Sequence, residues 1–279
     1  MQTEFDLKKI EEIVHLAINE DIGTGDITSS IFIPEGSESE GVLIAKEAGV
    51  VAGLPVAEYV LSQIDKDLIF KVNIEDGSRV EKGSVIASVK GSTLSLLSAE
   101  RLVLNFLQRL SGIATATNKF AEKVKGYKAQ ILDTRKTTPG WRYLEKYAVK
   151  IGGGSNHRMG LYDQILIKDN HLEIMEPEKE NGNIISLVKK ARDQVSKEVL
   201  IEVEVEDLCQ IKEMVDAGVD IILFDNMAPS KICEAVEIVK ELGNSRDAGT
   251  GRAILTEASG NIAIENVEEY AKAGVDRIS

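Results

Sequence analysis

The sequence has only two cysteines, and they do not form a recognisable site. Cys209 and Cys233 lie in helix-like segments, without the spacing of a metal site or the density of a disulfide framework. Sparse, unpaired cysteine is typical of proteins in a reducing compartment. We therefore expect a cytoplasmic protein whose fold depends on neither disulfides nor a cysteine-bound metal.

The sequence also lacks long apolar runs and an excess of positive charge. No apolar stretch is long enough to cross a membrane, and the polar, acidic N-terminus does not have the pattern of a signal peptide. The net charge of −13 argues against nucleic acid and anionic membrane surfaces as general partners. With 279 residues, 43% of them hydrophobic, and no low-complexity tract, the chain predicts one large or two ordinary globular domains.

One basic stretch stands apart from this acidic background. Residues 150–171, KIGGGSNHRMGLYDQILIKDNH, hold two of the three histidines. The window from Asp133 to Asn170 has seven basic and four acidic side chains, a net +3, whereas the rest of the chain carries −16. A chance excess on a solvated surface would explain the charge alone. A local cationic site would instead bind a small anionic substrate despite the distant negative field.

The first part of the chain mixes helical and strand-like patterns. Residues 6–20 predict an amphipathic helix capped by Asp6, in which His15 has a structural or surface position. Short β-branched runs split by glycine turns predict a strand-rich region over residues 25–93. A long helical pattern follows, and we expect it to end at Gly112. The expected domains are therefore residues 1–112 and 113–279.

After residue 112 the pattern becomes a regular alternation of apolar runs and helical segments. A short repeat, DAGVDIILFDN at 216–226 and KAGVDRIS at 272–279, marks the repeating unit. Buried strands that alternate with helices predict an α/β fold with a parallel sheet, and either an α/β barrel or a doubly wound sheet fits the pattern. The six predicted strands lie in the segments AQILDTR, DQILIKDN, VLIEVEVED, DIILFDN, RAILTEASGN and DRIS.

Four of these strands finish in polar clusters. The clusters occupy residues 133–136, 168–171, 225–226 and 257–261. In an α/β barrel the carboxyl ends of all strands meet on one face, where catalytic groups are found. The pattern therefore predicts that the four clusters form one site.

Two of the local patterns are ambiguous taken alone. In IEVEVE, the alternation puts Glu202, Glu204 and Glu206 on one face, which suits either an exposed edge strand or inward carboxylates that bind ribose or metal. Asp225 after the next strand favours the second interpretation. The GGG of 152–154 is a weak phosphate-loop signal. With His157, Arg158 and Lys168 nearby, it suggests a pocket for carboxylate or phosphate.

The segments LDTRKTTPGWRYLEKYAVKIGGGSNHRMGLYDQILIKDNH, EVEVE, LFDNM and EASGNI, in this order, closely resemble the quinolinate phosphoribosyltransferases. The resemblance extends from EDIGTGDITS near the start to AGVD near the end. It implies an N-terminal open α/β sandwich, an incomplete α/β barrel, and a homodimer or an assembly of dimers. The implied reaction joins quinolinate to phosphoribosyl pyrophosphate with Mg²⁺, and gives nicotinate mononucleotide, pyrophosphate and CO₂ for NAD synthesis.

The resemblance also implies roles for single residues. Arg135, His157, Arg158 and Lys168 would bind quinolinate, together with Arg101 from the neighbouring subunit. Lys136 and Lys168 would serve both quinolinate and the phosphoribosyl phosphates. Glu204 and Asp225 would hold the ribose hydroxyls and, through the substrate, Mg²⁺. Ser259 and Gly260 would form the turn for the 5′-phosphate. The expected catalytic residues are Lys136, Lys168, Glu204 and Asp225.

One departure and two alternatives accompany this resemblance. The family barrel normally continues beyond the position where this sequence stops, so we expect either a sequence truncated at its C-terminus or a copy that lacks that half of the phosphate site. A molybdenum-transport-associated relative of the same fold has a less clear substrate. A non-catalytic dicarboxylate-binding protein would need the cationic residues but would gain nothing from Glu204 and Asp225.

Overall fold

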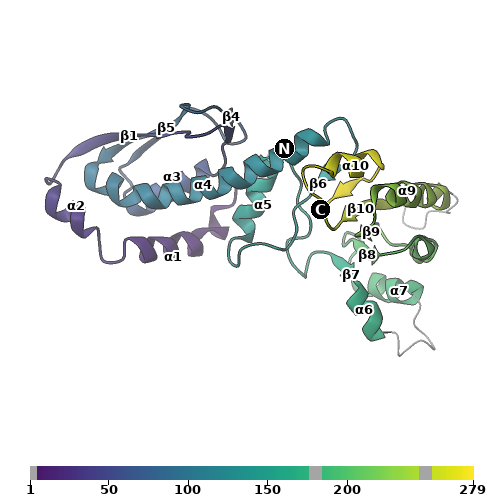
Figure 1. Cartoon of the computed structure of the whole chain (residues 1–279). Coiled ribbons are helices and arrows are strands. Elements are labelled where there is room, and N and C mark those ends of the chain that lie inside the picture. Colours follow the sequence, from purple (N-terminus) through teal and green to yellow (C-terminus); the bar gives the residue numbers. More distant parts are fainter. Residues whose placement is uncertain (1–4, 176–183, 245–252) are drawn as a thin grey trace. The chain divides into compact units, whose positions relative to one another are not determined.

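The computed structural model describes residues 5–175, 184–244 and 253–279. In this part of the chain, no helix is long and apolar enough to cross a membrane. The residues divide into two compact units, the first built from 1–118 and 136–154 and the second from 119–135 and 155–279. Each unit has its own hydrophobic core, and Figure 1 shows the helices and strands of both.

The first unit combines a small antiparallel sheet with helices. Its elements are a 3-10 helix (Leu7–Lys9), α1 (Glu11–Asp21), α2 (Ile27–Phe32), β1 (Glu38–Ile44), β2 (Gly49–Val50), α3 (Leu54–Ile64), β3 (Ile69–Val72), β4 (Arg79–Val80), β5 (Val85–Ser92), α4 (Thr93–Lys123) and α5 (Arg142–Ile151). Strand β5 lies between β1 and β3, and β2 pairs with β4. Val60 of α3, Ala87 of β5 and Phe106 of α4 share one core, so helices cover the sheet.

The second unit is a parallel sheet whose strands alternate with helices. Its elements are β6 (Gln130–Ile131), β7 (Ile165–Ile167), α6 (Asp169–Met175), α7 (Ile184–Gln194), β8 (Ile201–Val205), a 3-10 helix (Leu208–Gln210), α8 (Ile211–Ala217), β9 (Ile221–Asp225), α9 (Pro229–Asn244), β10 (Leu255–Ser259), α10 (Val267–Lys272) and β11 (Arg277–Ile278). All six predicted strands are present. Arg252, at the start of the fifth predicted segment, lies outside the described residues.

The strand order is that of a barrel rather than of a doubly wound sheet. The strands lie in the order β6-β11-β10-β9-β8-β7, and every strand pair is parallel. Successive strands from β7 to β11 are neighbours, and β6 closes against β11, as in a ring that is open between β6 and β7. A doubly wound sheet would reverse direction at a switch point. Helices α7, α8, α9 and α10 pack on the strands in the core of this unit (Figure 1).

The GVD repeat has the same structural role at both of its positions. The Asp220 carboxylate accepts a hydrogen bond from the Ile201 backbone N–H at 2.7 Å and pairs with Arg192. The Asp276 carboxylate accepts one from the Thr256 N–H at 2.9 Å and pairs with Lys128. Each aspartate precedes one strand and binds the amino end of the neighbouring strand. The repeat therefore fixes the register of β8 against β9 and of β10 against β11.

Two expectations for the first part of the chain need correction. Helix α4 continues through Gly112 to Lys123, so Gly112 does not end it. A single glycine costs an exposed helix interior only about 1 kcal/mol, which the buried stripe of α4 offsets. The region 25–93 also contains α2 and α3. Helix α3 begins with a proline in its first turn, and Asp76 accepts hydrogen bonds from the Gly53 and Leu54 backbone at its start.

We predict that Gly152→Ala destabilises the first unit. A Cβ at this position would lie 2.4 Å from the Ala114 carbonyl oxygen and 2.8 Å from Thr117 Cβ, where α4 and α5 meet. Overpacking of this kind costs about 1–3 kcal/mol. The matched control is Gly112→Ala, because nothing lies within 4 Å of its Cβ and it is helical. Urea unfolding should show a loss for the first variant and no loss for the second. Equal midpoints would contradict this helix contact.

Candidate active site

The carboxyl ends of four neighbouring strands carry the predicted polar residues of the second unit. Lys168 follows β7, Glu204 lies in β8, Asp225 ends β9 and Ser259 ends β10. The pairing aligns them, since Glu204 is opposite Leu223 and Ser259 is opposite Asp225. The parallel sheet thus places side chains that are far apart in the sequence on one edge, as the sequence pattern predicts.

Lys168 and Glu204 form an ion pair at this edge. Lys168 Nζ lies 3.0 Å from Glu204 Oε2, and the Lys168 side chain is 44% exposed whereas that of Glu204 is 9% exposed. An ion pair with one well-exposed partner contributes only about 0–1 kcal/mol. An incoming anion can therefore take over the lysine at little cost.

The segment that carries His157 and Arg158 is tied to the end of β6. One Asp133 oxygen accepts a hydrogen bond from the His157 backbone N–H at 2.9 Å, and the other accepts one from the Asn156 side-chain amide at 2.5 Å. Arg158 in turn donates to the Gln164 carbonyl oxygen at 3.3 Å. These bonds hold the segment beside Arg135, which lies two residues after Asp133.

Arg135 and Arg158 form a cationic pair in a partly dry environment. Burial lowers the pKa of Arg158, and the positive charge of Arg135 lowers it further, while Glu202 and Asp163 oppose the shift. A guanidinium group is not deprotonated in proteins, so the shift does not remove the charge of Arg158. Two fixed positive charges with limited solvation form a strong site for an anion with more than one carboxylate.

The imidazole of His157 faces two buried glutamates. His157 Nε2 lies 3.0 Å from Glu202 Oε2 and 3.6 Å from Glu257 Oε1, and both glutamate side chains are 0% exposed. The Gln164 amide also donates to Glu202 Oε2, at 2.5 Å. Strand β8 pairs with strands on both sides, so the interpretation of IEVEVE as an exposed edge strand is wrong.

Burial and the charge of Glu202 raise the pKa of Glu257 to about 7, against smaller lowering effects of His157, Ser279 and Arg277. Ser279 is near enough to lower this pKa but is not in hydrogen-bond geometry with the carboxyl. Unfavourable burial of a second carboxylate next to the first explains the direction of the shift.

The turns after β9 and β10 interlock. Asn226 and Asn261 both have positive φ angles, of 53° and 55°. The Asn226 backbone N–H donates to the Ser259 carbonyl oxygen at 2.9 Å, and the Asn261 amide donates to Asn226 Oδ1 at 2.9 Å. Gly260 has φ 96°, and a Cβ there would lie 2.2 Å from Asn226 Oδ1. Only glycine fits this turn.

The structure groups most but not all of the predicted site residues. Arg135, His157, Arg158, Lys168, Glu204, Asp225, Ser259 and Gly260 belong to the second unit. Arg101, which is exposed on α4, and Lys136, also exposed, belong to the first. The sequence interpretation gave Gln164 no role. It counted Glu202 and Glu257 only among the polar residues of their strands, and did not predict that both face His157. The sequence does contain a sign that both glutamates are buried, because each lies inside an apolar strand segment.

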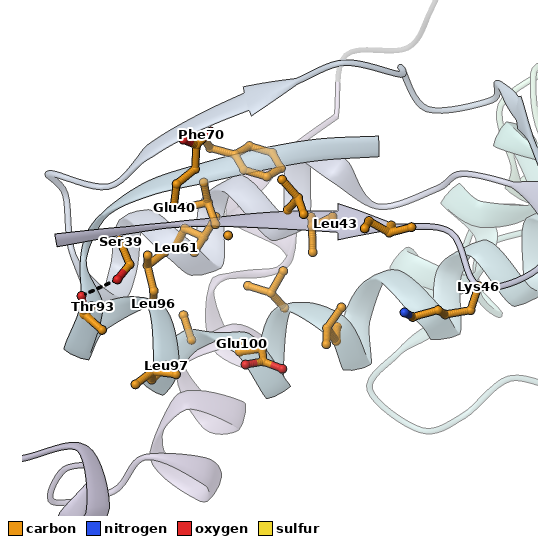
Figure 2. Close-up of a pocket in the computed structure, with 17 residues that line it drawn as sticks. Ser39, Glu40, Leu43, Lys46, Leu61, Phe70, Thr93, Leu96, Leu97 and Glu100 are labelled. Carbon is orange, nitrogen blue, oxygen red and sulfur yellow. Dashed lines mark hydrogen bonds between the residues drawn. The ribbon is translucent and has the colours of Figure 1, made fainter. Parts of the chain in front are cut away.

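The first unit has a separate pocket with a different character. It has a volume of about 480 Å³ and lies between β1 and α4, where Leu43, Phe70 and Leu96 are among the apolar lining residues (Figure 2). Its charged lining residues are Glu40, Glu100 and Lys46, and no arginine or histidine lines it. This apolar pocket does not suit a small anion with two carboxylates.

Comparison with known proteins gives consistent matches along the chain. The family model for the C-terminal domain of quinolinate phosphoribosyl transferase matches residues 113–279, and the model for the N-terminal domain matches residues 26–111. A Bacillus subtilis (strain 168) protein named probable nicotinate-nucleotide pyrophosphorylase (carboxylating) is 42% identical over 272 residues, which cover 97% of this chain and 88% of that protein.

Solved structures agree with these sequence matches. A Streptococcus pyogenes structure named NadC has a TM-score of 0.88 and 36% identity, and covers 100% of this chain and 92% of that one. The nicotinate-nucleotide pyrophosphorylase from Francisella tularensis has a TM-score of 0.87 and 36% identity, and covers 98% of this chain and 91% of that one.

We predict that Gly260→Ala disrupts the interlocked turns. The matched control is Gly274→Ala, which has a similar φ of 89° but a nearest neighbour 3.7 Å from its Cβ. Both variants incur about 1–2 kcal/mol for a left-handed alanine, and only Gly260→Ala adds a clash of about 1–3 kcal/mol with Asn226. Thermal unfolding should therefore rank Gly260→Ala clearly below Gly274→Ala. The reverse order would show that the Asn226 contact is absent in solution.

Proposed function

Because the chain belongs to the quinolinate phosphoribosyltransferase family, we propose that it transfers a phosphoribosyl group from phosphoribosyl pyrophosphate to quinolinate. The products are nicotinate mononucleotide, pyrophosphate and CO₂, a step in de novo NAD biosynthesis. The ring nitrogen of quinolinate forms a bond to the anomeric carbon as the bond from that carbon to pyrophosphate breaks. The 2-carboxylate then leaves as CO₂, and a proton takes its place on the ring.

One observation supports this proposal most strongly. The second unit contains a guanidinium pair, Arg135 and Arg158, and also two carboxylates at adjacent strand ends, Glu204 and Asp225. A protein that only binds a dicarboxylate has no use for the carboxylates. A transferase that joins a dianion to a ribosyl cation-like centre needs both kinds of group.

The cationic residues serve quinolinate. Arg135 and Arg158 can each receive a carboxylate through a pair of parallel N–H donors. Lys168, already at the strand edge, adds a mobile positive charge. His157 belongs to this side by family resemblance, and both of its ring nitrogens contact other protein groups. Positive surroundings also stabilise the electron pair that decarboxylation leaves on the ring.

The acidic residues serve the phosphoribosyl group. Glu204 and Asp225 hold the ribose hydroxyls and stabilise the positive charge that develops at the anomeric carbon as pyrophosphate departs. Ser259 and Gly260 offer a tight turn for the 5′-phosphate, and Lys136 adds a charge for the phosphates. The same two carboxylates fit Mg²⁺, which prefers oxygen ligands and takes many of them from substrate phosphates. Bound Mg²⁺ would neutralise charge on the leaving pyrophosphate.

The proposal also includes a homodimer whose two subunits share each active site, located in the cytoplasm. Arg101 is exposed on α4, at helical spacing from Leu94 and Leu97, which are 39% and 44% exposed. These three side chains share one face of the helix. An exposed strip with two leucines and an arginine suits contact with a second subunit, into whose pocket Arg101 would reach. The apolar members would stabilise the contact, and the arginine would complete the quinolinate site.

The proposed reaction predicts matched release of pyrophosphate and CO₂. Both should form in equal amounts when quinolinate, phosphoribosyl pyrophosphate and Mg²⁺ are supplied together, and neither should form when one substrate is omitted. Nicotinate is the control substrate, because it has one carboxylate for the guanidinium pair and none to lose as CO₂. Its affinity, measured by calorimetry, should be weaker by about 1.5–3 kcal/mol, the range for a charge-assisted hydrogen bond. Equal affinity for nicotinate and quinolinate would refute the pocket assignment.

Shared sites predict that two inactive variants rescue each other. In a dimer of one Arg101→Ala and one Lys168→Ala subunit, one site collects both lesions and the other is intact. Random exchange makes half of the dimers mixed, so activity should recover to about a quarter of wild type.

The matched control mixes Arg158→Ala with Lys168→Ala. Both residues belong to the second unit, so each site of a mixed dimer keeps one lesion and no rescue is expected. If Arg101→Ala stays inactive after proven subunit exchange, Arg101 serves its own chain instead.

A further inference from the structure

The buried cluster of His157, Glu202 and Glu257 has chemistry that substrate binding alone does not explain. It joins a loop to strands β8 and β10, and one oxygen or nitrogen from each side chain lies within 4.8 Å of the others. Both glutamates are fully buried. Two ionised carboxylates in such a place would cost several kcal/mol unless a positive charge or a proton compensates them.

The hydrogen bonds of His157 determine its charge. Its Nδ1 accepts a hydrogen bond from the Arg158 backbone N–H at 2.7 Å. A nitrogen that accepts cannot carry a proton, so the proton of the ring lies on Nε2, which faces Glu202 at 3.0 Å. In this arrangement the imidazole is neutral; its positive form, which would lower the pKa of Glu257, requires Nδ1 to give up the bond from Arg158.

The glutamate oxygens show where the compensating proton belongs. Glu202 Oε2 accepts a hydrogen bond from the Gln164 amide and lies 3.0 Å from His157 Nε2. Glu202 Oε1 and both oxygens of Glu257 are buried without a hydrogen-bond partner among the described residues. A proton on Glu257 would supply a donor beside Glu202 and remove the second negative charge.

Other charged groups around Glu257 are too weak to replace this proton. Arg277 on β11 lowers the pKa of Glu257 slightly, as do His157 and Ser279, but burial and Glu202 have the larger effect. A divalent cation would need the lone pair of His157 Nε2. That nitrogen has no lone pair while Nδ1 accepts from Arg158, because a neutral imidazole has one acceptor nitrogen.

We propose that Glu257 is a neutral acid below neutral pH and acts as a positioning residue beside Glu202 and His157, whose arrangement fixes Arg158 for an anionic substrate. Glu257 Oε1 lies 3.6 Å from His157 Nε2, which in turn lies 3.0 Å from Glu202 Oε2, and His157 Nδ1 accepts a hydrogen bond from the Arg158 backbone. The neutral form also keeps the cluster at one negative charge. Its effect on quinolinate rests on the function proposed above, whereas the protonation of Glu257 does not.

The proton can be observed in the free protein by infrared difference spectroscopy. The C=O stretch of a protonated carboxyl should persist above pH 6 and disappear with a midpoint near pH 7, where Glu257 ionises. Ordinary carboxyls lose their protons near pH 4 and do not contribute there. A spectrum without this band above pH 6 would overturn the proposal, as would a stoichiometric divalent metal that is bound in wild type and lost in Glu257→Gln.

Three variants assign the band. Glu257→Gln, which has the shape and charge of the neutral acid, should abolish it. Glu202→Gln should move its midpoint to lower pH, because the neighbouring negative charge is removed. Glu145→Gln is the control, since Glu145 is a buried glutamate whose pKa is lowered despite burial by its bonds with Arg109 and Thr138, and it should leave the band unchanged. A band that survives in Glu257→Gln would assign the proton elsewhere and refute the proposal.

Substrate affinity tests the positioning role. Ionisation of Glu257 adds a second negative charge to the cluster that holds His157 and, through it, Arg158, so the Kd for quinolinate should rise as pH increases from 6 to 9, by on the order of tenfold. By linkage, quinolinate should raise the pKa of Glu257 by the corresponding one unit. In Glu257→Gln this rise should be absent.

The outcomes separate the two proposals. If wild type and Glu257→Gln have the same pH dependence, Glu257 does not position the pocket. If quinolinate does not bind at any pH while the infrared band is present, the proposed function fails and the buried proton stands.

Discussion

The parallel register of the six-stranded sheet is the constraint on which the candidate site depends. Asp220 and Asp276 fix it from the amino ends of the strands, where each carboxylate accepts a backbone N–H from the neighbouring strand. Fixed amino ends leave the carboxyl ends aligned, so Lys168, Glu204 and Asp225 reach the same edge. A shift of one residue in β8 would turn Glu204 away from this edge and put Val203 or Val205 in its place.

The alternation in β8 that presents Glu204 to the site also places Glu202 on the same side of the strand, where it is buried. Residues two apart on a strand point to the same side, so a strand that presents one carboxylate to the site brings a second one deeper into the sheet. The protein accommodates this burial through the Gln164 amide, which donates to Glu202, and through His157, whose Nε2 lies 3.0 Å from it. Stability and function are therefore connected, because the groups that satisfy a buried charge also orient the loop that carries Arg158.

Much of this architecture is readable in the local sequence. The six strand segments, the GVD repeat and the polar clusters at the strand ends all predicted elements that the structure contains, because hydrophobic period and glycine placement act over a few residues. The end of α4 was not readable in this way. Gly112 has a low helix propensity, but the buried stripe on either side of it outweighs a local preference.

By itself, the sequence determined the α/β class, the cationic character of residues 133–170 and, through its motifs, the family. Each of these depends on residue types and short spacings. The residue pattern left a barrel and a doubly wound order open, the resemblance implied the barrel, and the strand order of the structure agrees with it. Only the tertiary structure showed that Glu202 and Glu257 face one histidine. Those two glutamates are 55 positions apart in the sequence, and no local pattern encodes their contact. Strand pairing brings them together, and burial then changes the chemistry of Glu257.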